Sequence, residues 1–233
     1  DSRGEPTIEV ALSCDDTTAV YGVPAGASTG KLEAHELRDG SDRYDGKGVQ
    51  KAIDKLDSIS QEILGFELFD QQKFDELLIK LDGTSDKSNL GANTIVGASL
   101  AYTMLCAKAK KQYLWQYISE TYSSSTGFPR IYANMVNGGK HAPGLDIQEF
   151  MVVPKNNDMP DSIEKITHFR NNLKQELSKI FGAGAELVGD EGGFAPNLKS
   201  NDEAIEVILQ AIQAAGYKAG KDIMIALDPA SSE

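Results

Sequence analysis

The sequence is poor in cysteine and in positive charge, and it contains no long apolar run. Cys14 and Cys106 are its only cysteines and lie far apart, so they do not make a disulfide framework and a reducing, cytoplasmic setting is expected. Lysine and arginine number 23 against 35 acidic residues, a net charge of -12, which argues against nucleic acid and anionic membrane surfaces as partners. No apolar run approaches the roughly 20 residues of a membrane span.

Several motifs of catalysis and targeting are also missing. There is no two-cysteine zinc pattern and no Gly-x-Ser-x-Gly elbow, so zinc sites and hydrolase triads find no support. If a metal is bound, oxygen ligands without thiols favour Mg²⁺, and metal ions would let an acidic protein bind an anionic substrate. The chain opens on Asp1 without a methionine or a visible signal peptide, so we expect its natural start to lie upstream.

The first half of the chain is typical of strands followed by helices, an α+β arrangement. Alternating apolar residues over 7–23 predict a β-hairpin, and a short strand is expected over 33–38. Apolar residues then recur at helical spacing from Val49, and Asp70 can cap a second helix. A third helix, over 92–111, is rich in small residues that permit close packing.

The stretch from Ser123 to Gly127 is the best linker in the chain, and it separates an N-terminal domain at 1–122 from a second domain at 128–233. The second domain alternates strands and helices, which predicts an α/β fold. The apolar run 223–227 fits a strand buried on both faces, as in parallel sheets and barrels. The other elements expected there are strands over 131–136 and 147–153 and helices over 162–181 and 202–215.

An acidic loop, Leu187-Val188-Gly189-Asp190-Glu191-Gly192-Gly193-Phe194-Ala195-Pro196, separates the two helices of this domain. Its glycines disfavour both helix and strand, so it is expected to be a tight loop that presents one or two acids. A surface turn whose acids serve solubility is the ordinary alternative. The apolar residues on both sides favour a partly buried loop, where a carboxylate needs a partner such as a metal ion or a substrate.

Two further acids lie at the ends of strands. Asp228 follows the buried run 223–227, where active sites of barrels and open sheets lie, although an N-cap or turn role before Pro229 is equally open. Glu149 shares a strand face with Met151, so it is a buried functional acid if that face is the core and a solvated residue if the strand is an edge strand.

Two glycine-containing loops are also candidates for the site. His141 follows Asn137-Gly138-Gly139-Lys140 and could bind phosphate or shuttle protons, although a lone loop histidine is more often inert. The segment Ala25-Gly26-Ala27-Ser28-Thr29-Gly30 lacks the Gly-Lys-Ser/Thr ending of a P-loop. A hinge-like lid is therefore the favoured interpretation, with an ordinary flexible loop as the alternative.

Taken together, these segments resemble the enolase family, the phosphopyruvate hydratases of glycolysis. The resemblance spans the whole chain, and its motifs follow the family's order. They are Asp1-Ser2-Arg3-Gly4-x-Pro6-Thr7, Gly26-Ala27-Ser28-Thr29-Gly30, Glu36-Leu37-Arg38-Asp39-Gly40, Gly46-Lys47-Gly48-Val49, Leu81-Asp82-Gly83-Thr84 with Lys87-Ser88-x-Leu90-Gly91-Ala92-Asn93, Asn137-Gly138-Gly139-x-His141-Ala142, Gln148-Glu149-Phe150-Met151, Val188 to Pro196, and Asp228-x-Ala230-Ser231-Ser232-Glu233.

The resemblance implies an α+β N-terminal domain, a β-meander with helices, followed by the first part of a TIM-like α/β barrel whose second strand is antiparallel. It implies the Mg²⁺-dependent, reversible dehydration of 2-phospho-D-glycerate to phosphoenolpyruvate, with two Mg²⁺ ions per active site. It also implies a cytoplasmic homodimer, in which the segment of Arg3 reaches the partner subunit. A further pool at the cell surface or outside the cell stays open.

The resemblance also suggests roles for individual residues. Asp228 and Ser28 would each help bind one of the Mg²⁺ ions, Ser28 from a lid formed by Ala25, Gly26, Ala27, Ser28, Thr29 and Gly30. Glu191 and Glu149 would assist departure of the hydroxyl group. His141, Glu149 and Gln148 would lie against the substrate.

The family's lysine base and its remaining Mg²⁺ ligands would lie beyond Glu233, so the chain is interpreted as an enolase fragment that is inactive alone. Two other interpretations stay open. One is a non-catalytic, enolase-like surface-binding protein or pseudo-enzyme. The other is a different enzyme of the enolase superfamily, such as a racemase or a cycloisomerase.

Overall fold

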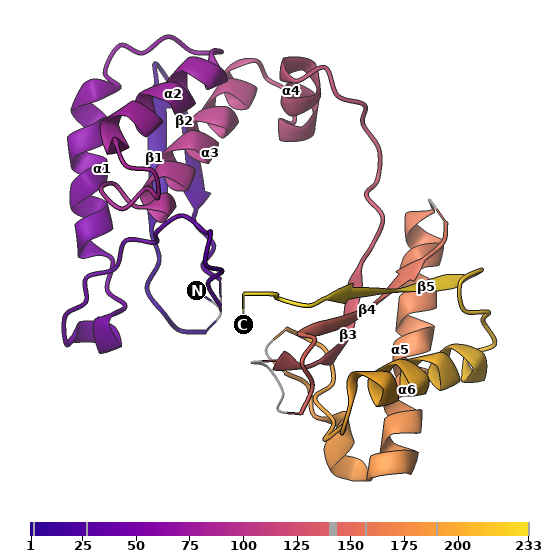
Figure 1. Cartoon of the computed structure of the whole chain (residues 1–233). Helices are drawn as coiled ribbons and strands as arrows, with labels where there is room; N and C mark the ends of the chain where they lie inside the picture. Colours follow the sequence, from indigo (N-terminus) through magenta and orange to yellow (C-terminus); the bar gives the residue numbers. More distant parts are fainter. Residues whose placement is uncertain (2, 27, 140–143, 157, 190, 233) are drawn as a thin grey trace. The chain divides into compact units, whose positions relative to one another are not determined.

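The chain divides between Thr126 and Gly127 into two units, each with its own hydrophobic core. The computed structural model, drawn in Figure 1, describes residues 1, 3–26, 28–139, 144–156, 158–189 and 191–232. The two units are described separately below. None of the helices in the described part of the chain combines the length and the apolar composition that crossing a bilayer requires.

The first unit joins a β-hairpin to a group of helices. Strand β1 (Glu9–Cys14) pairs antiparallel with β2 (Thr17–Gly22), which confirms the predicted hairpin. The short 3-10 helix η1 (Arg43–Gly46) follows, and then α1 (Gln50–Glu62), α2 (Gln71–Asp82), α3 (Ala92–Ala109) and α4 (Leu114–Thr121). The side chain of Asp70 accepts a hydrogen bond from the backbone N–H of Lys73, so its predicted role as the N-cap of α2 is confirmed.

Helix α3 packs directly on the hairpin. A Cβ atom at Gly97 would lie within 3.0 Å of side-chain carbons of Val10 and Val23, so only glycine allows this approach. The small residues predicted to permit close packing therefore have that function here. Figure 1 shows α3 running beside β1 and β2.

The strand predicted over 33–38 is not formed. This segment is held instead by bonds to the loop and helix beside it: the N–H of His35 donates to the carbonyl of Asp86, and the N–H of Leu37 donates to Oδ1 of Asn93. Because its polar backbone groups bond to these neighbours, it forms no ladder with another strand.

The second unit is a three-stranded sheet covered by two long helices. The strands β3 (Ala133–Asn137), β4 (Glu149–Pro154) and β5 (Ile223–Asp228) lie in the order β3-β4-β5, and β4 is antiparallel to both neighbours. The antiparallel second strand is therefore confirmed. Between β4 and β5 come α5 (Met159–Phe181), the 3-10 helix η3 (Ala183–Glu186) and α6 (Asn201–Ala214).

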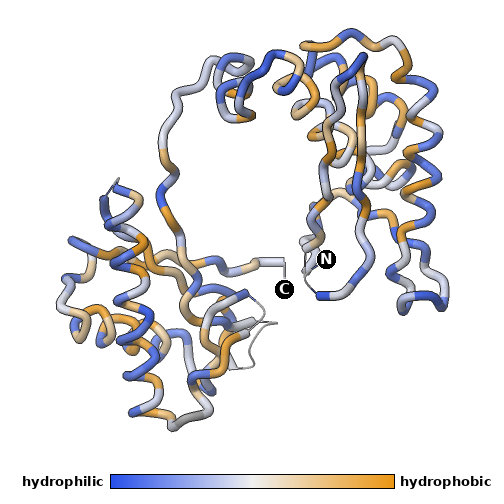
Figure 2. The backbone as a smooth tube through the Cα atoms, turned by 180° about the vertical axis from the view of Figure 1, so that it is seen from behind, coloured by the Kyte–Doolittle hydropathy of each residue, from blue (hydrophilic) through white to orange (hydrophobic). Residues whose placement is uncertain are grey.

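The core of this unit lies between the sheet and its helices. Phe150 and Val152 of β4 are fully buried against apolar residues of α5 and α6, such as Leu173 and Ile208. Along both helices in Figure 2, apolar and hydrophilic residues alternate, as expected of helices that cover one face of a sheet. The described sheet is open and does not close into a barrel.

The prediction that the run 223–227 is buried on both faces is wrong for the described chain. Ile223 is buried, but Met224, Ile225 and Ala226 are only half-buried and Leu227 is exposed. The reason is the position of β5, which among the described residues pairs only with β4 and therefore lies at the edge of the sheet.

Candidate active site

Three polar residues form a row across one end of the sheet in the second unit. Asn137 ends β3, Glu149 begins β4 and Asp228 ends β5; in the strand register Asn137 is opposite Glu149, and Glu149 is opposite Asp228. The row forms because β4 is antiparallel to both neighbours, which puts its first residue beside their last residues. The fold thus brings together two of the predicted acids, which are 79 positions apart in the sequence (228 minus 149).

The row extends one residue further through the backbone. The N–H of Gly138 donates to the carbonyl of Gln148 over 2.8 Å, and the N–H of Gln148 donates to the carbonyl of Asp228 over 3.0 Å. Gln148 is only 7% exposed, and its side-chain Oε1 has no hydrogen-bond partner in the described part of the chain. A buried acceptor without a partner is costly, so this oxygen is suited to a ligand that supplies a donor or a positive charge.

The environment of Glu149 settles one of the alternatives. Strand β4 is the central strand of the described sheet, so the interpretation of Glu149 as a residue of an edge strand is wrong. Its side chain does not belong to the helix-covered core, since Phe150 and Val152 supply that face and Glu149 and Met151 are half-buried. Glu149 therefore lies at the end of the other sheet face, where it has a partner within the chain.

Asp228 is exposed at the end of β5. Its Oδ1 accepts a hydrogen bond of 3.0 Å from the backbone N–H of Ala230, so part of the carboxylate has the turn role that the sequence left open. This bond restricts the side chain at the strand end and leaves a second carboxylate oxygen on the same group.

The acidic loop is fastened along β3. The N–H of Phe194 donates to the carbonyl of Met135, and the carbonyl of Phe194 accepts from the N–H of Asn137, both over 2.8 Å. Gly193, Phe194 and Pro196 are buried, so the predicted partial burial is confirmed. The apolar residues before the acids do not contribute to it, because Leu187 is 71% exposed and Val188 is exposed too.

Glu191 is the described acid of this loop, whereas Asp190 lies outside the described residues. The side chain of Glu191 is half-buried, and its Oε2 accepts a hydrogen bond of 3.4 Å from Nδ2 of Asn134 on β3. The loop thus presents Glu191 beside the strand whose last residue begins the polar row. Asn134 was not predicted as a site residue; the signal for it was two asparagines, Asn134 and Asn137, within an otherwise apolar strand.

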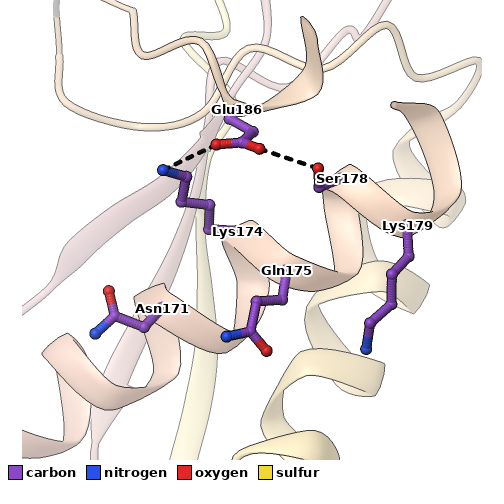
Figure 3. Close-up of a pocket in the computed structure, with 6 residues that line it drawn as sticks. All are labelled: Asn171, Lys174, Gln175, Ser178, Lys179 and Glu186. Carbon is purple, nitrogen blue, oxygen red and sulfur yellow. Dashed lines mark hydrogen bonds and ion pairs between the residues drawn. The ribbon is translucent and has the colours of Figure 1, made fainter. Parts of the chain in front are cut away.

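The segment that precedes the acidic loop lies at a polar depression between α5 and η3, apart from the polar row at the strand ends (Figure 3). Glu186 accepts a hydrogen bond from Ser178 over 3.0 Å and forms an ion pair of 2.8 Å with Lys174. The hydrogen bond with Lys174 and, to a smaller extent, the hydrogen bond with Ser178 lower the pKa of the Glu186 carboxyl below its ordinary value. None of the predicted site residues lines this depression, whose lining residues are Asn171, Lys174, Gln175, Ser178, Lys179 and Glu186.

The predicted lid belongs to the first unit. The guanidinium of Arg3 donates to the backbone carbonyls of Ala25 and Gly26 over 2.8 and 3.2 Å. Ser28 is half-buried and lines a hollow together with Glu36 and Ala92. Gly26, Thr29 and Gly30 of the lid are described as well, while Ala27 and the predicted phosphate ligand His141 lie outside the described residues.

The oxygen donors of the candidate residues suit Mg²⁺. Asp228 offers a carboxylate at a strand end and Ser28 a hydroxyl group, which are hard ligands of the kind Mg²⁺ takes, usually with several waters. Within the described residues no three His, Cys, Asp or Glu side chains gather into one metal site. The oxygen atoms of Asp228 and Ser28 are therefore donors whose chemistry fits the ion.

Comparisons with known proteins match both units. Residues 1–118 match the family model described as "Enolase, N-terminal domain", and residues 126–233 match the model described as "Enolase, C-terminal TIM barrel domain". Over 238 aligned residues the chain is 46% identical to "Enolase 2" of Lactococcus lactis subsp. lactis (strain IL1403). That alignment covers 100% of this chain and 55% of the relative, so the chain spans about half the length of the curated relative it matches.

Proposed function

The chain belongs to the enolase family, and from this we propose that the protein containing it is a phosphopyruvate hydratase. The proposed reaction is the reversible dehydration of 2-phospho-D-glycerate to phosphoenolpyruvate and water. The observation that carries the proposal is the gathering of Glu149, Asp228 and Glu191 at β3, β4 and β5 of one sheet. Catalytic groups of α/β barrels usually lie at the ends of strands, which is where Glu149 and Asp228 lie.

The chemistry explains why such a site needs acids and metal together. The proton on C2 of the substrate is weakly acidic because it lies next to a carboxylate, and its removal adds negative charge to a group that is already charged. Two Mg²⁺ ions, when bound, supply positive charge that stabilises this additional negative charge. We propose that Asp228 would hold one ion and that Ser28 of the lid would help hold the other.

The remaining proposed roles concern the departure of the C3 hydroxyl. Glu191, together with Glu149, would deliver a proton to the leaving oxygen, since a protonated carboxyl is a suitable general acid. Gln148, whose buried Oε1 has no partner in the described chain, would contact the substrate or the polar groups that surround the substrate. His141 would lie on the phosphate side, and the lysine base of the family would come from sequence after Glu233.

The test uses the full-length protein that contains this chain, with phosphoenolpyruvate formation followed by absorbance in the presence of Mg²⁺. We expect Glu191→Gln to lower the rate by more than about 100-fold, the usual contribution of a general acid, and to leave Mg²⁺ binding intact in calorimetry. Glu206→Gln on the exposed side of α6 is the matched control and should retain the parent rate. Retained activity in Glu191→Gln would remove Glu191 from the mechanism.

A parent protein that binds Mg²⁺ but forms no phosphoenolpyruvate would favour the non-catalytic, pseudo-enzyme alternative. We also propose that the full-length protein is a homodimer. Light scattering after size-exclusion chromatography would then measure twice the mass of one full-length polypeptide. A cytoplasmic location is proposed as well, supported by the two free cysteines, Cys14 and Cys106.

A further inference from the structure

A β-bulge turns two asparagines of β3 toward the same side of the strand. In the pairing of β3 with β4, Asn134 is opposite Met151 and Val136 is opposite Phe150, so Met135 is the extra residue. Residues three apart in a regular strand point to opposite faces, whereas one inserted residue restores the same face. The amide of Asn134 accordingly donates from Nδ2 to Oδ1 of Asn137 over 2.8 Å.

Asn137 is the residue around which the acidic loop folds. Its side chain is fully buried, and Cβ atoms at Gly189 and Gly193 would each lie within 3.0 Å of its amide, closer than real Cβ atoms come. The loop closes on itself here, since the N–H of Gly189 donates to the carbonyl of Gly193 over 2.9 Å. The two glycines therefore let the loop backbone wrap the Asn137 side chain, and this sets the position of the loop on β3.

The same amide of Asn134 reaches the acid of the loop. Its Nδ2 donates both to Oδ1 of Asn137, over 2.8 Å, and to Oε2 of Glu191, over 3.4 Å. Asn137 is packed inside the loop, while its Nδ2 and the Oδ1 of Asn134 have no hydrogen-bond partner in the described chain. The bond between the two amides is therefore the contact that turns the Nδ2 of Asn134 toward Glu191. An N–H group is thereby directed at Glu191 from a rigid strand.

We propose that Asn134 is a positioning residue for Glu191, acting on the departure of the hydroxyl group and not on the removal of the C2 proton. This inference rests on the proposed function. In the reaction, a base takes the C2 proton, the electron pair left on C2 forms the double bond to C3, and the C3–O bond breaks. The proton from Glu191 goes to the leaving oxygen and completes the water molecule, so only this second step needs the Glu191 carboxyl in place.

Two measurements separate these steps in the full-length protein. Exchange of the substrate's C2 hydrogen with D₂O, followed by proton NMR, reports the first step, and phosphoenolpyruvate absorbance reports the whole reaction. Asn134→Leu keeps the side-chain size and removes the N–H donor. We expect it to slow phosphoenolpyruvate formation by about 5- to 100-fold, the usual effect of removing one partner of a hydrogen bond, with KM and C2 exchange each changed less than about threefold.

Asn134→Asp gives a second variant of nearly unchanged shape, and its carboxyl group donates a hydrogen bond only when it is protonated. Its rate of phosphoenolpyruvate formation relative to the parent should therefore rise as the pH falls, which a purely structural defect would not produce. Asn171→Leu makes the same change as Asn134→Leu at an exposed position of α5, and it should behave as the parent in both assays.

The outcomes are distinguishable from those that test the proposed function. A parent that does not convert 2-phosphoglycerate overturns the proposed function and this inference with it. An active parent whose Asn134→Leu variant keeps full phosphoenolpyruvate formation overturns this inference alone. An equal fall of exchange and product formation in both Asn134 variants, without rescue at low pH, also overturns it and identifies Asn134 as a structural residue.

Discussion

At the scale of single residues, Asp82 is a buried carboxylate whose charge is satisfied by the chain around it. It is 3% exposed at the end of α2 and accepts hydrogen bonds from the N–H groups of Leu90, over 2.8 Å, and Thr84, over 2.9 Å, and from the Thr84 hydroxyl. Burial acts to raise its pKa, but the hydrogen bonds from Leu90 and Thr84 and the charge of Lys87 outweigh it, so the pKa lies below the ordinary 3.8.

This arrangement predicts a pH-dependent contribution to stability. Since the pKa of Asp82 is lower in the folded state than in the unfolded state, its ionised form stabilises the fold above the unfolded pKa, and the contribution is lost as the pH falls through the folded pKa. We expect Asp82→Asn to lower the free energy of unfolding by about 1–3 kcal/mol at pH 7, because its amide cannot accept all these bonds.

Urea unfolding at several pH values would measure this effect. The difference between parent and Asp82→Asn should begin to shrink as the pH falls below about 4, where the unfolded parent takes up a proton, and should go on shrinking as the pH falls through the lower pKa of the folded state. Asp57→Asn, at an exposed position of α1, is the control and should leave the unfolding free energy within about 0.5 kcal/mol of the parent. A difference that stays constant down to pH 2 would contradict the assignment of the stability to the ionised form.

Residues of the candidate site differed in how far the sequence could predict them. Glu149 and Asp228 could be found because each lies at the end of an apolar strand, a local pattern, and the structure puts them in register. Asn134 was missed: two asparagines in an apolar strand are unusual, but the contact of Asn134 with Glu191 depends on a bulge and on a loop 57 positions away. Alternation along a strand contains no information about either feature.

At the scale of elements, the acidic loop depends on two glycines for its packing against β3. Neither Gly189 nor Gly193 has room for a side chain, because Asn137 fills that space. We expect Gly193→Ala to force the loop away from Asn137, to cost about 1–3 kcal/mol as overpacking does, and to reduce phosphoenolpyruvate formation by displacing Glu191. Thermal unfolding and the absorbance assay on the full-length protein would measure both effects.

The matched control for this substitution is Gly184→Ala in η3, where a Cβ atom would have no neighbour within 4 Å. It should leave the midpoint of unfolding and the activity close to those of the parent. If Gly193→Ala were as harmless as Gly184→Ala, the close wrapping of Asn137 by the loop would be incorrect.

Among elements, helices and the hairpin were predicted more securely than irregular segments. The period of apolar residues predicted α1, α2 and α3, and Asp70 marked a helix start, because these signals are local to the chain. The segment 33–38 was wrongly predicted as a strand, since its bonds go to Asp86 and Asn93, about 50 positions away. A strand needs a neighbouring strand, and propensity alone cannot supply one.

At the scale of the whole molecule, the sheet of the second unit is open within the described chain. β5 pairs with β4 on one side only, and Leu227 on this strand is exposed although it is apolar. Unpaired strand edges with apolar residues favour association between chains. Barrels remove such edges by closure, and the family model that matches residues 126–233 describes a TIM barrel.

From this we predict that a polypeptide of residues 1–233 alone does not turn over 2-phosphoglycerate and associates through the open sheet. In size-exclusion chromatography it should elute as aggregates or oligomers, and the absorbance assay with Mg²⁺ should show no phosphoenolpyruvate. Adding a charge at the edge, as in Leu227→Lys, should reduce the association without restoring activity, because the substitution acts on the open edge and adds no metal ligand. A monomeric polypeptide with measurable turnover would show that Glu149, Glu191 and Asp228 suffice for the reaction without any strand beyond β5.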